Sequence, residues 1–511
     1  MRTRMLWAAG LAIAGCNYPD LPPVGASPDA PPGSAAGGPH ITLDWQIALP
    51  ASVEPAPVFK PIAPAPRVRI APLRATLDAN TPPPAFVDAT YSADGTIAIP
   101  EAYVTEAWRL EYTLDDGVPH EVQWQPADRV GHITVPLIGR LTRSSLPAGA
   151  GYSITPTAPP TSYTLPHVFT TGLWSEGEAP IPAGSTIDYD FAQSVSLSGP
   201  LGAPDSAAGD RGILIDYHTD ASTCRVATGG AAFDPTLHAG SHSAFTPLWE
   251  TTSIQTHIRP IIGDRLDALS SLVTTANASS SFISVGVIPS SDVIGFIDGG
   301  AQLLGAAALP TPVMIPLLGC PLNVNVDILV AKPSALRDLP NAAHIQLVAS
   351  RSVPTLNTTL VSGIEAIIPV GTDGAFVTSF PAPFATQIAL NTLIGKVALD
   401  SSADQNNVGA PHGTFTLSFT PETGADLRAD YYDVILHRIT GSALTTERIY
   451  TVTAPSVQID AALLQPLTDY VFEIRTIKGH PQAAQGDFSL TELPYGETTV
   501  MARTIRTGPA Q

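Results

Sequence analysis

The sequence is poor in cysteine and in basic side chains, and each shortage excludes a class of protein. It has three cysteines. Cys224 and Cys320 are about a hundred residues apart and have no paired histidine spacing, so no zinc site is expected. Lysine and arginine number 25 against 45 acidic residues, which gives a net charge of -20. A surface of that sign repels phosphate backbones, and nucleic-acid binding is therefore excluded.

Long hydrophobic runs are also missing. Residues 5–14 are too few to cross a bilayer. Residues 293–318 are longer but contain Asp298 and prolines at 310, 312 and 316, which a membrane-spanning helix would not carry. No transmembrane helix is predicted. With 44% apolar residues, the chain can still bury several cores of ordinary domain size.

The N-terminus carries the most informative motif. Arg2 and Arg4 precede the short apolar run, which ends at Ile13-Ala14-Gly15-Cys16. This pattern is typical of a processing signal, and it resembles the lipobox of bacterial lipoproteins. The resemblance implies removal of residues 1–15, lipidation of Cys16 and a stable membrane anchor through several acyl chains. Asn17 is not the aspartate associated with inner-membrane retention, which favours the outer membrane. The alternative is an ordinary signal peptide that is cut further downstream.

A proline-rich segment follows. From residue 17 to 84, 17 of 68 residues are proline, which favours extended backbone over packed structure. Residues 16–67 are therefore expected to act as a tether. Within this segment, residues 41–47 and 68–73 alternate between apolar and polar side chains, which predicts two edge strands that belong to the first domain.

The rest of the chain predicts a mainly β fold of tandem β-sandwich domains. Residues 68–165 form the first, because a hairpin is expected to pair the strand through Trp108 and Tyr112 with Val122 and Trp124 across an Asp-Asp-Gly turn. These aromatic residues are expected to pack in the core and not to form an exposed carbohydrate platform. Ile133, Val135 and Leu137 are expected to continue the same pattern.

Residues 166–400 are expected to form a mostly β middle domain. Strands are predicted at 187–191, 213–217, 282–288 and 322–330. One flanking helix is predicted over 261–276, from apolar residues at helical spacing after Pro260. In an oxidising compartment Cys224 and Cys320 are expected to form a disulfide worth up to ~4.7 kcal/mol, the alternative being two buried free thiols.

The last stretch, 408–507, resembles a fibronectin type III domain. The resemblance is carried by Leu464-x-Pro466-x-Thr468-x-Tyr470 with the strand after it, and by the strands around 416–419 and 432–438. It implies a β-sandwich without catalytic activity, with Tyr470 as the tyrosine corner that bonds upstream backbone. Phe419 stands where the family usually has tryptophan.

Catalytic motifs are largely absent. No Gly-x-Ser-x-Gly elbow and no glycine-rich phosphate loop occur. His238 and His242 have a metal-binding spacing, but Ala239 replaces the glutamate that a zincin needs, so no metal or other cofactor is expected. The weak catalytic candidates are Asp216, His218, His238 and His242.

These observations predict a lipid-anchored envelope protein that acts as a structural or binding module, with a protein or glycan of the envelope as its partner. The alternative is an envelope hydrolase of peptides or glycans, with its site in the middle domain.

Overall fold

The computed structural model describes residues 40–509 with interruptions, the longest at 156–166, 191–205, 261–277, 290–312 and 316–327. The described residues are mainly β, as expected, and are accompanied only by short 3-10 turns. No helix in these stretches is long and apolar enough to cross a membrane. Cys16, Cys224, Cys320 and the helix predicted over 261–276 lie outside the described residues.

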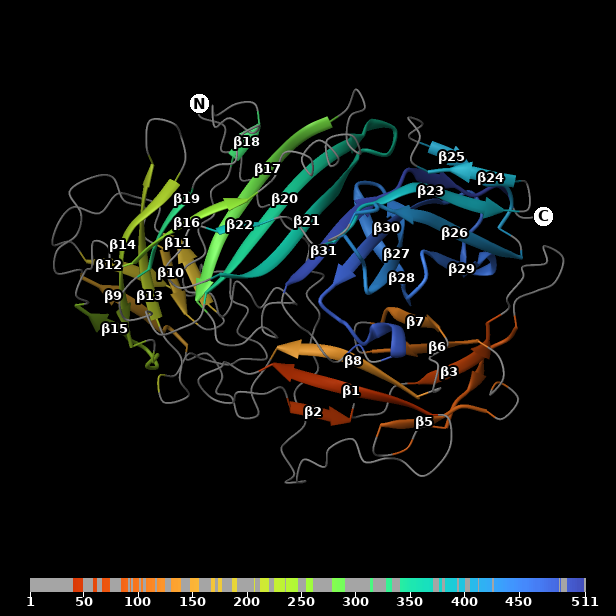
Figure 1. Ribbon diagram of the computed structural model, residues 1–511, viewed down its shortest axis with the longest axis horizontal. Coiled ribbons are helices and arrows are strands. Elements are labelled where there is room, and N and C mark those ends of the chain that lie inside the picture. Colours follow the sequence, from red (N-terminus) through yellow and green to blue (C-terminus); the bar gives the residue numbers. More distant parts are fainter. Residues whose placement is uncertain are drawn as a thin grey trace.

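The first β-sandwich has two layers. One layer contains β1 (His40–Ala48), β2 (Val58–Pro61), β5 (Thr96–Ala98) and β8 (Val130–Ile138), and the other contains β3 (Val68–Pro72), β4 (Val87–Asp88), β6 (Trp108–Thr113) and β7 (Pro119–Trp124). Figure 1 shows these strands together at the lower right. Alternate residues of both layers meet in one buried core: Ile41, Leu43, Val68, Ile70, Ile97, Trp108, Leu110, Tyr112, Val122 and Ile133.

The predicted hairpin is confirmed. β6 and β7 pair antiparallel with Trp108 opposite Trp124, and the turn between them contains Gly117 at φ 73°. Trp108 and Tyr112 are buried, which places them in the core as expected.

The position predicted for the first island was wrong. β1 does join the first sandwich, but it is not an edge strand, because it pairs with β8 on one side and with β2 and β5 on the other. Ile41 and Leu43 are fully buried, so this strand belongs to the core of the sandwich. β8 pairs parallel with β1 and does not continue the β6–β7 hairpin.

The middle of the chain supplies several smaller sheets and a long hairpin. Its strands are β9 (Gly151–Ile154), β10 (His167–Thr170), β11 (Leu173–Glu176), β12 (Ile187–Asp190), β13 (Gly212–Thr219), β14 (Arg225–Phe233), β15 (His242–Phe245), β16 (Ile254–Pro260), β17 (Ala278–Pro289), β18 (Val313–Ile315), β19 (Ile328–Lys332), β20 (Asn341–Val353), β21 (Thr358–Val370) and β22 (Phe376–Thr378). Strands predicted at 187–191, 213–217 and 282–288 are present as β12, β13 and β17. Of the strand predicted at 322–330, β19 covers the end.

The C-terminal sandwich packs two sheets, ordered β24-β23-β26-β29 and β31-β30-β27-β28. Its strands, with two short ones beside them, are β23 (Ala385–Thr392), β24 (Gly395–Ala398), β25 (Gln405–Asn407), β26 (Thr414–Pro421), β27 (Tyr431–Thr440), β28 (Ala443–Val452), β29 (Ser456–Asp460), β30 (Asp469–Lys478), β31 (Tyr495–Met501) and β32 (Thr504–Arg506). This is an immunoglobulin-like or fibronectin type III-like arrangement. The sandwich includes β23, which precedes residue 408 and pairs with β26.

Tyr470 is buried, and its hydroxyl accepts a hydrogen bond of 2.8 Å from the backbone N–H of Gln465. A tyrosine hydroxyl that returns to upstream backbone in this way defines a tyrosine corner.

Tyr470→Phe is expected to lower the free energy of unfolding by ~1 kcal/mol, because the Gln465 N–H loses its acceptor. Tyr450→Phe is the matched control, since the Tyr450 hydroxyl is buried and has no hydrogen-bond partner among the described residues. The same substitution there should cost nothing or stabilise. Urea denaturation of both variants measures this. Equal decreases in the free energy of unfolding would show that the hydrogen bond between Tyr470 and Gln465 does not stabilise the fold.

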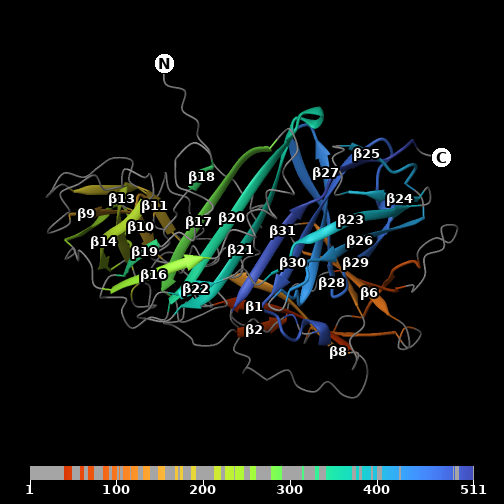
Figure 2. The same ribbon diagram turned by 45° about the horizontal axis from the view of Figure 1, so that its top comes forward.

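One sheet runs through regions that are far apart in the sequence. β28 pairs parallel with β7 of the first sandwich, and β31 pairs antiparallel with β21 of the middle region. The result is a sheet of 14 strands, which Figures 1 and 2 show extending from the long β17–β20–β21 strands through β31, β30, β27 and β28. The sequence boundaries at 165 and 408 are therefore crossed by hydrogen-bonded strand pairs.

Candidate functional site

The largest group of buried charges in the described chain lies where the two sandwiches join. We call it the junction cluster: the buried Arg109, Glu111, Glu121 and Arg448, together with Arg69, which is 32% exposed. Strands β6 and β7 turn their apolar residues toward the first sandwich core and their charged residues toward the opposite face. β28 lies beside β7 in the same sheet, with Glu121 in register with Tyr450, so this charged face continues onto β28, where Arg448 contacts it.

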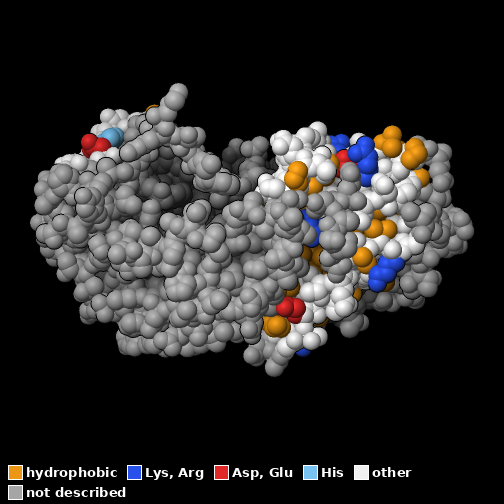
Figure 3. All heavy atoms as spheres, turned by 90° about the horizontal axis from the view of Figure 1, so that it is seen from above, with side chains coloured by type: hydrophobic (Ala, Val, Ile, Leu, Met, Phe, Trp, Pro, Cys, Tyr) orange, Lys and Arg blue, Asp and Glu red, His pale blue; other side chains and the backbone are white. Residues whose placement is uncertain are grey.

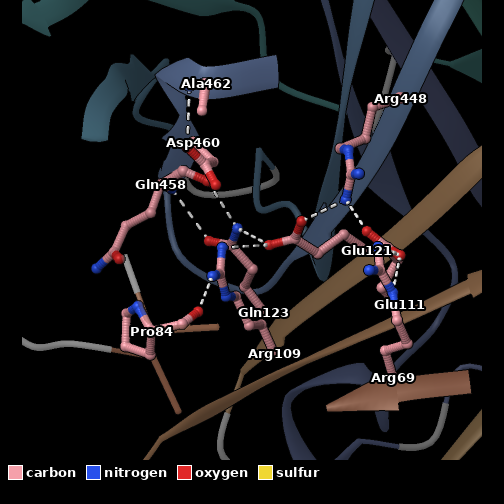
Figure 4. Close-up of polar contacts among 10 residues, drawn as sticks. All are labelled: Arg69, Pro84, Arg109, Glu111, Glu121, Gln123, Arg448, Gln458, Asp460 and Ala462. Carbon is pink, nitrogen blue, oxygen red and sulfur yellow. Dashed lines mark hydrogen bonds and ion pairs between the residues drawn. The ribbon is translucent and has the colours of Figure 1, made fainter. Parts of the chain in front are cut away.

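Arg448 is the central cation of the junction cluster (Figure 4). Its Nη1 lies 2.6 Å from Glu111 Oε2 and 2.8 Å from Glu121 Oε2. Glu111 also pairs with Arg69, and Arg109 Nη1 lies 3.7 Å from Glu121 Oε1. Three cations thus face two carboxylates, which is the pairing that buried charges require.

Gln123 extends these contacts to the other sheet of the C-terminal sandwich. Its Nε2 donates to Glu121 Oε1 at 2.7 Å and to the backbone carbonyl of Gln458 at 2.8 Å. Its Oε1 accepts from the Gln458 N–H at 3.0 Å. The Gln123 side-chain amide thus makes both hydrogen bonds that a neighbouring strand would make to the edge strand β29. These bonds connect the edge of the C-terminal sandwich to the first sandwich.

The junction cluster is not accessible to a substrate. Glu121 is 1% exposed, and burial raises its pKa while Arg448 and Arg109 oppose the rise. Burial likewise raises the pKa of the Tyr450 phenol above its ordinary value. Since every carboxylate here is held by an arginine, we interpret the cluster as a structural joint.

A second polar group lies on the opposite face of the C-terminal sheet. Glu473 Oε2 lies 2.9 Å from His437 Nε2, and its Oε1 accepts from Arg475 Nε at 2.6 Å. Burial alone would raise the pKa of Glu473, but Arg475 and the His437 hydrogen bond outweigh it and hold the pKa at about 2. His437 Nδ1 faces the Thr446 hydroxyl at 3.3 Å. His437 is only 8% exposed and Glu473 6%, so the imidazole is buried away from any substrate.

The four catalytic candidates of the sequence are distributed over two strands and a turn. Asp216 and His218 belong to β13, and their side chains lie outside the described residues. His238 is exposed ahead of the turn that leads to β15, and His242 begins β15. Because side chains of β13 are not described, the grouping of all four stays a prediction.

His242 does have polar neighbours that sequence reasoning missed. Its Nδ1 lies 3.4 Å from the Ser153 hydroxyl and 3.6 Å from Asp188 Oδ1, and the Ser153 hydroxyl donates to Asp188. The three residues come from β15, β9 and β12, which form one small sheet. No local motif links them, and only the strand pairing brings them together.

This arrangement differs from a serine hydrolase triad. In a triad the base bridges nucleophile and carboxylate through two different ring nitrogens. Here the same nitrogen faces both groups, and the serine proton points to Asp188. Asp188 is also 64% exposed, so water screens its charge. Among the described residues, no group of three or more His, Cys, Asp or Glu side chains could hold a metal ion.

No family model and no curated protein matches the chain. Among solved structures, a tetra-tandem repeat from the extending region of a large adhesion protein is 10% identical, with 92% of this chain and 99% of that chain covered and a TM-score of 0.13. The eight N-terminal Ig domains of Down Syndrome Cell Adhesion Molecule are 9% identical, with 92% and 59% covered and the same TM-score. The fold assignment therefore rests on the strand pairing of this chain.

Proposed function

We propose that the chain is a lipid-anchored structural and binding module of the cell envelope, at the outer membrane, whose partner is an envelope protein or glycan. The observation that carries this proposal is the junction between the sandwiches. Charges that could have formed a reactive site are paired and buried there, and they join two sandwiches through one sheet.

Figure 3 shows hydrophobic side chains interspersed with polar and charged ones on the described part of one face. The large exposed hydrophobic residues, Val87, Val361, Leu463 and Leu467, come from different elements. Such a mixed surface is compatible with a spacer or a binding module.

The anchor at Cys16 is tested by fractionation of cells that express the full chain. The wild type is expected in the membrane fraction and to incorporate a labelled fatty acid, whereas Cys16→Ser should lose the label. Cys224→Ser is the control that should keep both properties. An unlabelled wild-type chain in the soluble fraction would contradict the proposal.

The second candidate function is an envelope hydrolase, favoured only by the contacts among Ser153, Asp188 and His242. A fluorophosphonate probe tests it directly, because such probes react only with activated serines. The geometry predicts that Ser153 stays unlabelled in the native chain. Labelling that disappears in His242→Ala would establish the hydrolase instead.

A further inference from the structure

The longest parallel strand pair among the described residues includes β1, which follows residues 17–39 of the proline-rich segment. β1 pairs with β8 over nine residues, from His40 opposite Val130 to Ala48 opposite Ile138. Because the strands are parallel, their starting ends lie together. The chain therefore enters β1 at one end of the pair and leaves β8 toward the middle region at the other end (Figure 1).

This geometry determines how the pair responds to tension. When parallel strands are pulled from opposite ends, all hydrogen bonds along the pair share the force and must break together. When they are pulled from the same end, the bonds break one at a time. Tension between the proline-rich segment and the chain after β8 acts from opposite ends, so it shears the pair.

The side chains of β1 add resistance to sliding. Ile41 and Leu43 are fully buried in the first sandwich core. A slip by one residue would turn them away from the core, because side chains alternate between faces. A slip by two residues would leave part of the strand unpaired. Rupture by sliding therefore requires loss of core packing as well as of hydrogen bonds.

From the body of the first sandwich, force can pass to the rest of the molecule. β7 pairs parallel with β28 from His120 opposite Ile449 to Gln123 opposite Val452, and the junction cluster lies beside this pair. The C-terminal sandwich is thus joined to the sandwich that holds β1.

We infer that the β1–β8 pair is a mechanical clamp that transmits tension between the N-terminal segment and the folded body. The inference rests on the proposed function only for the direction of the load, since attachment at Cys16 would place the tension on the N-terminal side of β1. The clamp itself follows from the register.

Single-molecule force spectroscopy on the full chain tests the clamp. Handles are attached through a bio-orthogonal amino acid at residue 139, directly after β8, and at either residue 39 or residue 50, the two sides of β1. Both attachment pairs leave every residue of the two strands unchanged, so only the point of load differs. Attachment at 39 and 139 shears the pair, and attachment at 50 and 139 unzips it.

The rupture force is expected to be higher for the 39/139 attachment, with slower unfolding at equal load. An equal or lower force for that attachment would overturn the clamp. Leu43→Ala should lower the rupture force of the 39/139 attachment relative to the wild type, with circular dichroism to confirm that the variant is folded. These outcomes do not depend on lipidation, so failure of the clamp and failure of the anchor at Cys16 are distinguishable.

Discussion

Glu121→Ala is expected to lower the free energy of unfolding by about 3–5 kcal/mol. The substitution removes a buried carboxylate that faces Arg448 at 2.8 Å and Arg109 at 3.7 Å. Arg448 would keep Glu111, but Arg109 would lose its carboxylate while remaining 4% exposed. Leaving a buried cation without its carboxylate lowers the stability by more than the intact ion pair contributes to it. Urea denaturation followed by tryptophan fluorescence measures the loss.

The control for Glu121→Ala is Glu447→Ala, which removes another ion-paired glutamate from the same part of the molecule. Glu447 lies 2.8 Å from Arg438, but both side chains are about 30% exposed. Because the Arg438 side chain is partly exposed, solvent still screens its charge after the substitution, and a cost of at most ~1 kcal/mol is expected. Equal losses in the two variants would show that burial of the junction cluster contributes nothing.

The position of Glu121 also predicts where the damage spreads. Because Glu121 and Gln123 connect β7 with β28 and β29, their loss should loosen the contact between the sandwiches before either core opens. Amide hydrogen exchange in Glu121→Ala is expected to increase first in β7 and β28. Faster exchange confined to the C-terminal core would contradict this order.

Glu473→Gln is expected to reduce the loss of stability on acidification. The pKa of Glu473 falls from 4.5 in the unfolded chain to about 2 in the folded one. A lowered carboxyl pKa gives stability that is complete above pH 4.5 and is lost as the pH falls toward 2. The shift corresponds to about 3 kcal/mol, and Glu473 is only 8% exposed, so solvent screening is small.

The pH profile of unfolding, compared between wild type and Glu473→Gln, measures this contribution. Asp433→Asn is the control with the opposite sign, because burial raises the pKa of Asp433. A raised carboxyl pKa favours the fold at low pH and loses that contribution as the pH rises. If the free energy of unfolding of Glu473→Gln falls with acidification as steeply as that of the wild type, the ion pair with Arg475 does not stabilise the fold.

The sequence by itself determined the local structure of this protein. Alternating apolar residues fixed the strands, Gly117 closed the hairpin, and the pattern around Tyr470 indicated the type of the C-terminal sandwich. These features depend on neighbours in the chain, where side-chain period and turn chemistry decide the backbone conformation.

Only the tertiary structure decided which strands meet. β1 pairs with β8, and β7 with β28, across separations that no local pattern encodes. Arg109, Glu111 and Glu121 alternate with core residues and so match a solvent-facing side of a hairpin, but the C-terminal sandwich covers them. Ser153, Asp188 and His242 meet for the same reason. Burial, and with it the role of each charge, depends on sheet packing between distant segments, because water is excluded only once both surfaces are present.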